Sequence, residues 1–254
     1  MKSEILRSSL YVAIASVISI SGTATASAGD PIVADGIHID TSGETTEGAG
    51  YLGHAMSAIN GGSITASDMT LSTTGLQASG ANASGAGSHI EISNSTITTS
   101  GYVSPGLNAE AGGKIIAEGV TFNSTGENGR GVQASGAGSE VTFNGGSIST
   151  AQLYADGVRA RNGGTINIGR DSSGNGSVIT VAGGAWGGIV GGGASGSGKL
   201  NIDGANFRVL SGLLAQGNDA ALNVTDTTIE SRAGAVLVDA GGQASLQNVT
   251  IRSG

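Results

Sequence analysis

Cysteine is absent from this sequence, proline occurs only twice, and aromatic residues make up 3% of the 254 positions. Without cysteine, no disulfide can stabilise the fold, although small exported domains commonly depend on disulfides. With so few large side chains, a thick globular core is excluded, and any core must be built from small aliphatic residues. The 47 glycines also fit a disordered chain, so order has to be argued from the pattern of residues.

Basic residues are also scarce. The sequence has 11 lysines and arginines against 19 aspartates and glutamates, which gives a formal net charge of −8 at pH 7. The sequence contains no run of basic residues. Proteins that bind nucleic acid concentrate positive charge on the surface that contacts the phosphates. We therefore expect no nucleic-acid partner.

The first 28 residues have the three parts of a secretory signal peptide. Lys2 and Arg7 form a basic start, an apolar stretch covers residues 10–20, and an Ala-x-Ala cleavage site ends at Ala26 or Ala28. The apolar stretch has about half of the ~20 residues that a membrane-spanning helix requires. We therefore predict a signal peptide over residues 1–28, followed by an exported chain over residues 29–254.

A repeat of apolar residues fills the exported chain. In one copy the offsets i, i+2, i+5 and i+7 are occupied by Ile90, Ile92, Ser95 and Ile97. Alternation with period 2 places each pair of side chains on one face of a strand, and the change of phase requires a turn between two strands. Copies of this pattern start at Ile32, Ile64, Ile90, Ile115, Val141, Ile166, Leu200, Leu222 and Ala244.

The turn inside each uninterrupted copy has its own signature. Position i+4 holds only glycine, asparagine or aspartate, the residues that adopt positive φ at the lowest cost. These residues are Gly36, Asp68, Asn94, Gly119, Gly145, Gly204, Asp226 and Asn248. A third alternating run precedes most copies and starts at Leu107, Val132, Val158, Leu213 and Val236. The sequence therefore predicts an all-β, right-handed parallel β-helix with three short strands per coil and about nine coils.

No linker or change of composition divides residues 29–254, so we expect one parallel β-helix domain with two excursions from the coil. The first excursion covers residues 41–53. The second begins at Arg170 and delays the pattern by eight residues, so that it resumes at Ile179 and Val181. Exposed loops on a rigid scaffold often carry function.

The apolar pattern continues to the end of the chain. Val249 and Ile251 still follow it, three residues before Gly254. A solenoid normally ends in a cap that covers its last strand edges. We therefore expect the chain to be a C-terminally truncated piece or reading frame of a longer protein.

The signal peptide, the missing cysteines and the coil pattern resemble one family of exported proteins. Stretches such as GLNAEAGGKIIAEGVTFNSTG (106–126) and GVQASGAGSEVTFNGGSIST (131–150) carry the resemblance. The chain resembles the passenger domain of autotransporters of Gram-negative bacteria, of the pertactin-like and self-associating adhesin type. This implies a non-catalytic adhesin passenger whose partner is a host surface ligand or an identical passenger on another cell.

The same resemblance implies a location at the cell surface or outside the cell. Family members reach it through a C-terminal β-barrel in the outer membrane. The ten-residue alternating strands and aromatic girdles of such a barrel are not found in this sequence. Without that partner, the periplasm is the other expected location.

Motifs that carry chemistry are few. A nucleophile elbow, GxSxG, does not occur. Residues 191–196 fit GxGxxG, but they open no predicted helix, and a chance match is expected in so glycine-rich a chain. His38, His54 and His89 lack the spacing of metal ligands, so we interpret them as outward-facing or corner histidines. We expect no catalytic, cofactor-binding or metal-binding residue.

The enzymatic alternative is a polysaccharide lyase or glycoside hydrolase, because parallel β-helices often cleave glycans with charged groups on one outer face. The best candidates are Asp156, Arg159, Arg161 and Asp203. Arg159 and Arg161 flank the inward Ala160, so both point outward. When the third alternating runs of successive copies are aligned, Asp156 lies level with Arg130 on one side and with Gly187 on the other. We therefore expect Asp156 to have a basic neighbour and not the second carboxylate of a glycosidase.

Overall fold

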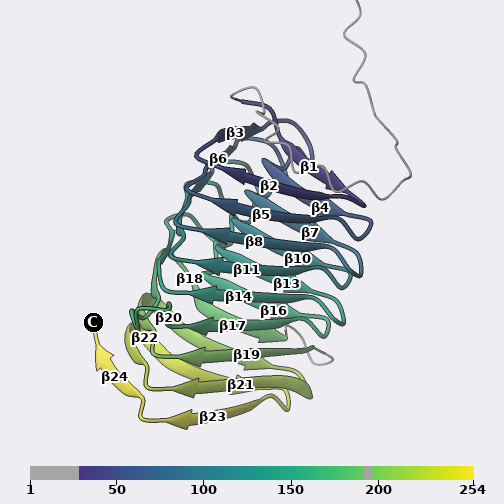
Figure 1. The fold of residues 1–254 in the computed structure, drawn as a ribbon. Helices are drawn as coiled ribbons and strands as arrows, with labels where there is room; N and C mark the ends of the chain where they lie inside the picture. Colours follow the sequence, from purple (N-terminus) through teal and green to yellow (C-terminus); the bar gives the residue numbers. More distant parts are fainter. Residues whose placement is uncertain (1–28, 192–195) are drawn as a thin grey trace, which may run out of the picture.

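The computed structural model describes residues 29–191 and 196–254, so the predicted signal peptide and most of the GxGxxG-like segment lie outside the described residues. All regular elements in these residues are β-strands. The strands wind into a solenoid of about nine coils, in which each strand pairs in parallel with the equivalent strand of the next coil (Figure 1). The predicted parallel β-helix with three strands per coil is confirmed, and its right-handed sense stays a prediction.

The strands form three stacks that run along the coil axis. Stack one contains β1 (Ile32–Asp35), β4 (Met56–Ile59), β7 (Ala81–Ser84), β10 (Leu107–Glu110), β13 (Val132–Ser135) and β16 (Val158–Arg161). Stack two contains β2 (His38–Ser42), β5 (Ser63–Ser67), β8 (His89–Ser93), β11 (Lys114–Glu118), β14 (Glu140–Asn144), β17 (Thr165–Gly169), β19 (Ser197–Asp203), β21 (Asp219–Thr225) and β23 (Gln243–Gln247). Stack three contains β3 (Thr45–Gly48), β6 (Thr70–Thr73), β9 (Thr96–Thr99), β12 (Thr121–Ser124), β15 (Ser147–Thr150) and β24 (Thr250–Ser253).

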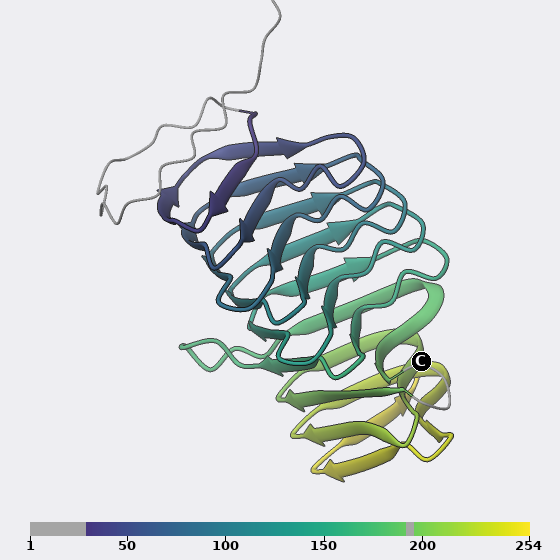
Figure 2. The same ribbon diagram turned by 90° about the vertical axis from the view of Figure 1, so that its right-hand side faces the viewer.

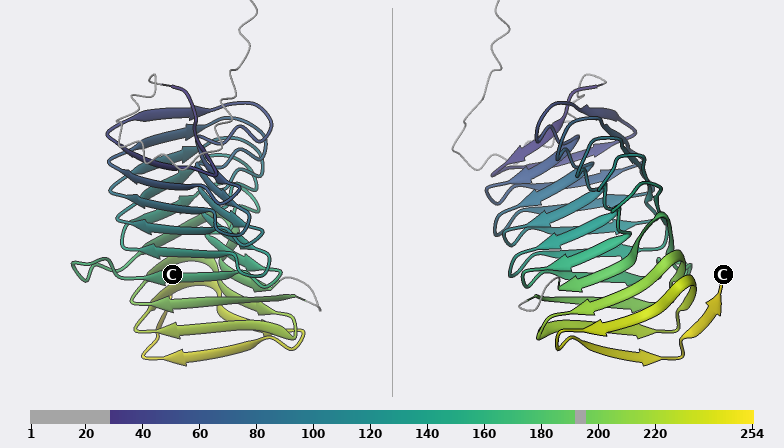
Figure 3. Two further views of the ribbon diagram at one scale, coloured as in Figure 1. Left: turned by 45° about the vertical axis from the view of Figure 1, so that its right-hand side comes forward. Right: turned by 180° about the vertical axis from the view of Figure 1, so that it is seen from behind.

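Three long strands join two stacks in the last coils. They are β18 (Val178–Gly191), β20 (Asn206–Gln216) and β22 (Thr228–Asp239). Each extends stack three with its first half and stack one with its second half, so that the turn between these stacks is replaced by an irregularity in the strand. The change is visible where the green and yellow ribbons bend without a break (Figure 3).

The core is a set of ladders of small apolar side chains along the axis. Ile92 of β8 pairs with Ala66 of β5 and Ala117 of β11, and all three are at most 3% exposed. The partners Ile97, Phe122 and Ile148 form the corresponding ladder in stack three and are equally buried. Alternation along each strand therefore decides which side chains point inward, as the sequence predicted.

The turn between stacks two and three has the predicted conformation. All eight glycine, asparagine and aspartate residues predicted there have positive φ, from 48° at Asp226 to 68° at Gly204. Seven of them lie in this turn. Gly36 lies in the turn between stacks one and two, and its place in the first coil is taken by Gly43 with φ of 69°.

The predicted alignment of the first coil is therefore wrong by one stack. Ile32 pairs with Met56 in stack one, and Ile39 is the residue that pairs with Ile64 in stack two. Both pairs of residues are apolar and alternate with polar ones, so the sequence pattern alone did not distinguish the two stacks.

The predicted excursion over residues 41–53 is also wrong for most of its length. Strand β3 lies within it and pairs with β6 in stack three. Thr46 fills the inward position that Leu71 fills in the next coil, and it is fully buried. A polar residue at this position removed the apolar signal, which is why the segment was interpreted as a loop.

The second predicted excursion does leave the coil. The loop that starts at Arg170 is closed by an antiparallel bridge and projects sideways from the stack (Figure 2). The point at which the pattern resumes was predicted wrongly, because Ile179, and not Val181, pairs with Ile148. Ser177 is the buried residue of the preceding turn, and a polar residue there cannot be found from apolar spacing.

Candidate functional site: an arginine groove

One position of the coil lines up side chains that can carry function. It lies two residues before the first inward residue of each stack-one segment. In six successive coils this position holds His54, Ser79, Pro105, Arg130, Asp156 and Trp186, which we call the polar column. Backbone hydrogen bonds between coils set the alignment, since Gly131 N donates to Asp156 O and Gly157 N donates to Trp186 O, each at 3.0 Å.

The position after the polar column is reserved for very small residues. It holds Ala55, Gly80, Gly106, Gly131, Gly157 and Gly187. A Cβ at Gly106 would collide with the ring of Phe122, and a Cβ at Gly131 would collide with Ile148 and with the carbonyl of Gly157. The backbone therefore passes directly over the inward side chains of stack three, and this close passage fixes the position of the polar column.

Outward residues of β7, β10 and β13 form a ladder of amides beside the polar column. Asn108 Nδ2 donates to Asn82 Oδ1 at 2.8 Å, and Gln133 Nε2 donates to Asn108 Oδ1 at 2.9 Å. Arg130 Nη1 donates to Gln133 Oε1 at 3.3 Å and ends the ladder. The three amides are only 3–7% exposed, so they form a fixed polar floor.

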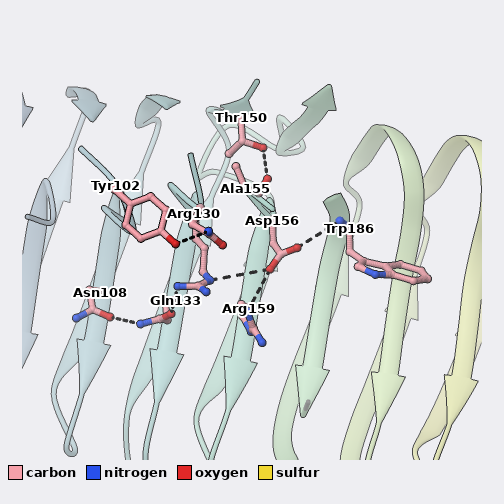
Figure 4. Close-up of polar contacts among 10 residues, drawn as sticks. Tyr102, Asn108, Arg130, Gln133, Thr150, Ala155, Asp156, Arg159 and Trp186 are labelled. Carbon is pink, nitrogen blue, oxygen red and sulfur yellow. Dashed lines mark hydrogen bonds and ion pairs between the residues drawn. The ribbon is translucent and has the colours of Figure 1, made fainter. Parts of the chain in front are cut away.

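Asp156 connects the polar column to the arginines of β16. Its Oδ2 lies 3.5 Å from Nη1 of Arg159 and 4.0 Å from Nε of Arg130 (Figure 4). Its Oδ1 accepts a hydrogen bond from Trp186 N at 3.3 Å. Burial raises the pKa of Asp156, while Arg159, the bond from Trp186 and Arg130 act in the opposite direction.

The arginines of this cluster are incompletely satisfied. The Nε atoms of Arg130, Arg159 and Arg161 are buried and have no hydrogen-bond partner among the described residues. Burial, followed by the positive charge of Arg159, lowers the pKa of Arg130 to about 10. The same two causes, in the same order, lower the pKa of Arg161. The charges of Arg130 and Arg161 are therefore held at a cost in solvation and repulsion.

A shallow groove of about 180 Å³ runs beside this cluster. Its lining combines the polar column, the amide ladder, the turn from stack three and two charged residues of stack one. The lining residues are Leu52, His54, Gln77, Ser79, Val103, Pro105, Asn108, Glu110, Arg130, Gln133 and Arg161, and we call this the arginine groove. Its volume is below the ~300–1,000 Å³ of a site that encloses a small molecule.

His54 lies at the other end of the groove. Its Nδ1 accepts a hydrogen bond from Ser79 N at 2.9 Å, which leaves the ring proton on Nε2 in the neutral form. Burial lowers the pKa of His54, and the charge of Glu110 opposes this shift. The ring is therefore a neutral hydrogen-bonding group at pH 7.

Three lining residues of the groove, Leu52, Gln77 and Val103, belong to a column of residues in an unfavourable backbone conformation. Leu52, Gln77, Val103, Asn128 and Tyr154 occupy the same turn in successive coils, with φ between 55° and 57°. Non-glycine residues adopt this left-handed region at a cost of about 1–2 kcal/mol each. Such strain persists where the surrounding structure holds it in place and is typical of ligand-binding segments.

Large exposed side chains precede this strained column. They are Tyr51, Leu76, Tyr102 and Leu153, each 45–67% exposed. Successive coils are joined here by the hydrogen bonds Leu52 N to Leu76 O and Gln77 N to Tyr102 O, both at 3.0 Å. Tyr102 is close to Arg130 and accepts a hydrogen bond from Asn128 Nδ2 at 3.3 Å (Figure 4).

Three of the four candidate residues predicted from the sequence lie together. Asp156, Arg159 and Arg161 belong to one cluster, and the predicted proximity of Asp156 to Arg130 is confirmed. The predicted neighbour on the other side, Gly187, is wrong by one residue, because Val158 pairs with Gly188 and places Trp186 beside Asp156.

Asp203 is not part of this cluster. It lies at the end of β19 and lines a different hollow, on stack two, together with an asparagine ladder. In that ladder Asn201 Nδ2 donates to Asn167 Oδ1 at 2.8 Å, and Asn223 Nδ2 donates to Asn201 Oδ1 at 2.9 Å. These amides satisfy one another, so we assign the hollow a structural role.

Sequence reasoning missed several lining residues of the arginine groove. His38 and His89 are paired with Asp40 and Glu91 on the outside of stack two, but His54 lines the groove. The missed lining residues are His54, Glu110 and Gln133, and Tyr102 and Trp186 lie beside the groove. His54 and Trp186 share the register of Asp156 and Arg130, a signal that a search for known motifs does not use.

Among the residues that the structure describes, no three or more histidine, aspartate or glutamate side chains converge as a metal site. None of these residues forms a helix with the length and hydropathy needed to cross a membrane. Comparison with protein-family models, with curated proteins and with solved structures finds no match. The function therefore has to be argued from the groove itself.

Proposed function

We propose that the chain is a non-catalytic, exported adhesin passenger of the autotransporter type, which binds a host surface ligand or an identical passenger through one flank of its coil. The observation that supports this best is the arginine groove. Together with the turns beside it, the groove places fixed amides, arginines with unpaired Nε atoms and exposed tyrosines along one flank of the coil, as a binding surface requires. The predicted signal peptide supports a location at the cell surface or outside the cell.

One observation favours the enzymatic alternative, a polysaccharide lyase or glycoside hydrolase. Asp156 and the arginines lie next to a groove, as charged catalytic groups would. Glycosidases, however, use two carboxyl groups at about 5–9.5 Å from each other. Both ion-pair partners that Asp156 has among the described residues are arginines, and its other oxygen accepts from Trp186 N. We therefore prefer binding to catalysis.

The test of this proposal uses the complete protein in the bacterium that produces it. We expect deletion of its gene to reduce cell aggregation or host-cell binding, and the wild-type gene to restore it. If deletion changes neither property, the adhesin proposal is wrong.

A turnover screen against polysaccharides decides the enzymatic alternative. We expect no product from any polymer. Product formation that is abolished by Asp156→Ala or Arg159→Ala would replace the adhesin proposal with a glycan-cleaving enzyme.

A further inference from the structure

We propose that the arginine groove and the tyrosine-bearing turns beside it bind an acidic polysaccharide whose chain lies along the coil axis. The anionic groups, carboxylate or sulfate, meet the arginines, and the faces of the sugar rings pack on the aromatic side chains. This proposal rests on the proposed binding function and names the class of its ligand.

The charge distribution is the first argument. Arg130, Arg159 and Arg161 gather beside the groove of a chain whose formal net charge is −8. Among the described residues, the carboxylates that act on this cluster are Asp156 and Glu110. Arg161 in particular has neither a hydrogen bond nor an ion pair to another side chain among the described residues. Arg161 is partly exposed, so an anionic oxygen from outside the chain can reach its guanidinium group. Guanidinium groups bind carboxylate and sulfate oxygens through charged hydrogen bonds.

The shape of the groove favours an extended polymer over an enclosed small molecule. Its lining residues come from five successive coils, from Leu52 to Arg161. With adjacent coils about 4.8 Å apart, the groove extends for about 20 Å along the axis. Its volume of about 180 Å³ is spread over this length, so a ligand gains contact by length along the rod.

The aromatic side chains are the second, independent observation. All tyrosines of the described residues and the single tryptophan lie on this flank: Tyr51, Tyr102, Tyr154 and Trp186. Tyr51 and Tyr102 occupy the same turn position two coils apart, a distance of about 10 Å. This is comparable with the length of a disaccharide unit, so the two rings can contact equivalent faces of a repeating sugar chain. Tyrosine and tryptophan combine an apolar face with a polar edge, which suits a ligand that has an apolar side and a hydrated side.

The strained turns explain how these side chains are held. Tyr51 and Tyr102 directly precede Leu52 and Val103, which have φ of 55° and 56°. The backbone of each turn is bonded to the next coil, so the chain that carries Tyr51 and Tyr102 is held in place before any ligand binds. Preorganisation of this kind lowers the cost of ordering on binding. Nucleic acid also combines anionic groups with flat rings, so duplex DNA is one arm of the test.

Isothermal titration calorimetry of the purified full chain tests the proposal. The probes are polygalacturonate for carboxylate, heparin for sulfate, dextran as a neutral polymer and duplex DNA as a different polyanion. We expect binding to polygalacturonate or heparin that weakens with salt, and no binding to dextran or DNA. Whichever acidic polymer binds identifies the anionic group.

Variants locate the binding to the groove. We expect Arg161→Gln to weaken binding of the acidic polymer by about tenfold or more, and Tyr102→Ala by about threefold or more. Arg208→Gln is the matched control, because Arg208 is exposed, pairs with Glu230 and lies in stack three. The control should bind like the wild type. Thermal unfolding of each variant shows that it is folded.

Three results would overturn the assignment: no binding to either acidic polymer, equal binding to dextran or DNA, or unchanged affinity in folded Arg161→Gln. The proposed function fails separately. If gene deletion abolishes adhesion while no acidic polymer binds, the ligand class is wrong and the adhesin stands. If acidic polymer binds but deletion leaves aggregation and host-cell binding unchanged, the groove assignment stands and the adhesin proposal is wrong.

Discussion

At the scale of single residues, the groove and the cluster beside it contain side chains whose charge is disfavoured by burial. Arg130, Asp156 and Arg161 have pKa values shifted toward their neutral forms, with burial as the first cause. A shift toward the neutral form means that folding disfavours the charge. Groups held at such a cost are typical of functional sites.

The pH dependence of stability measures the free-energy cost of charging His54 in its buried position. Its folded-state pKa lies below the usual 6.5, because of burial and despite Glu110. Its contribution to stability is therefore present above the unfolded-state pKa and is lost as the pH falls through the folded-state pKa. We expect the fall in thermal midpoint between about pH 7.5 and about pH 5 to be smaller in His54→Gln than in the wild type. Equal falls would show that His54 is not desolvated as described.

At the scale of the elements, the turn from stack three into stack one decides where the groove lies. Its glycine column permits the backbone to pass over Phe122 and Ile148. The residue before each of these glycines then belongs to the polar column. A side chain at the glycine position would have to move either the core ladder or the polar column.

We expect Gly131→Ala to lower the free energy of unfolding by about 1–3 kcal/mol, because its Cβ would overpack against Ile148 and the Gly157 carbonyl. Gly234→Ala is the matched control, since Gly234 is an exposed strand residue with open space around its Cβ position. The control should change stability by less than about 1 kcal/mol. Chemical denaturation of both variants checks this, and equal losses would contradict the role given to the glycine column.

At the scale of the whole molecule, stability is shared between neighbouring coils. Each coil of the rod buries its inward side chains against the coils before and after it, so a single coil has no core of its own. Among the described residues, β23 and β24 pair with one strand each, and their inward Leu246 and Ile251 are 45% and 56% exposed. The cooperativity of unfolding should therefore decrease toward the coil formed by β23 and β24.

Hydrogen exchange of the purified chain checks this gradient. We expect amides of β23 and β24 to exchange fastest among the strands, and amides of β8, β11 and β14 to exchange slowest, because these central strands have a paired strand on both sides. Protection in β23 equal to that in β14 would contradict stacking as the main source of stability.

The sequence predicted those features that depend on alternation along one strand. Ile92, Ile97, Phe122 and Ile148 point inward as predicted, because period 2 fixes the face of a strand wherever one side is buried. Positive φ at the glycine, asparagine and aspartate turns was predictable for the same local reason. The prediction of the first coil was wrong where Thr46 takes an apolar position.

The sequence by itself determined the coil, its three strands and the pairing of Asp156 with Arg130, because constant spacing brings equivalent positions of neighbouring coils together. Only the tertiary structure decided the groove. His54, Gln133 and Arg130 line one groove, and Tyr102 lies beside it, because of turns whose strained φ and glycine contacts depend on the coils above and below. Those contacts join residues about 25 positions apart, and no local pattern specifies what a turn places beside them.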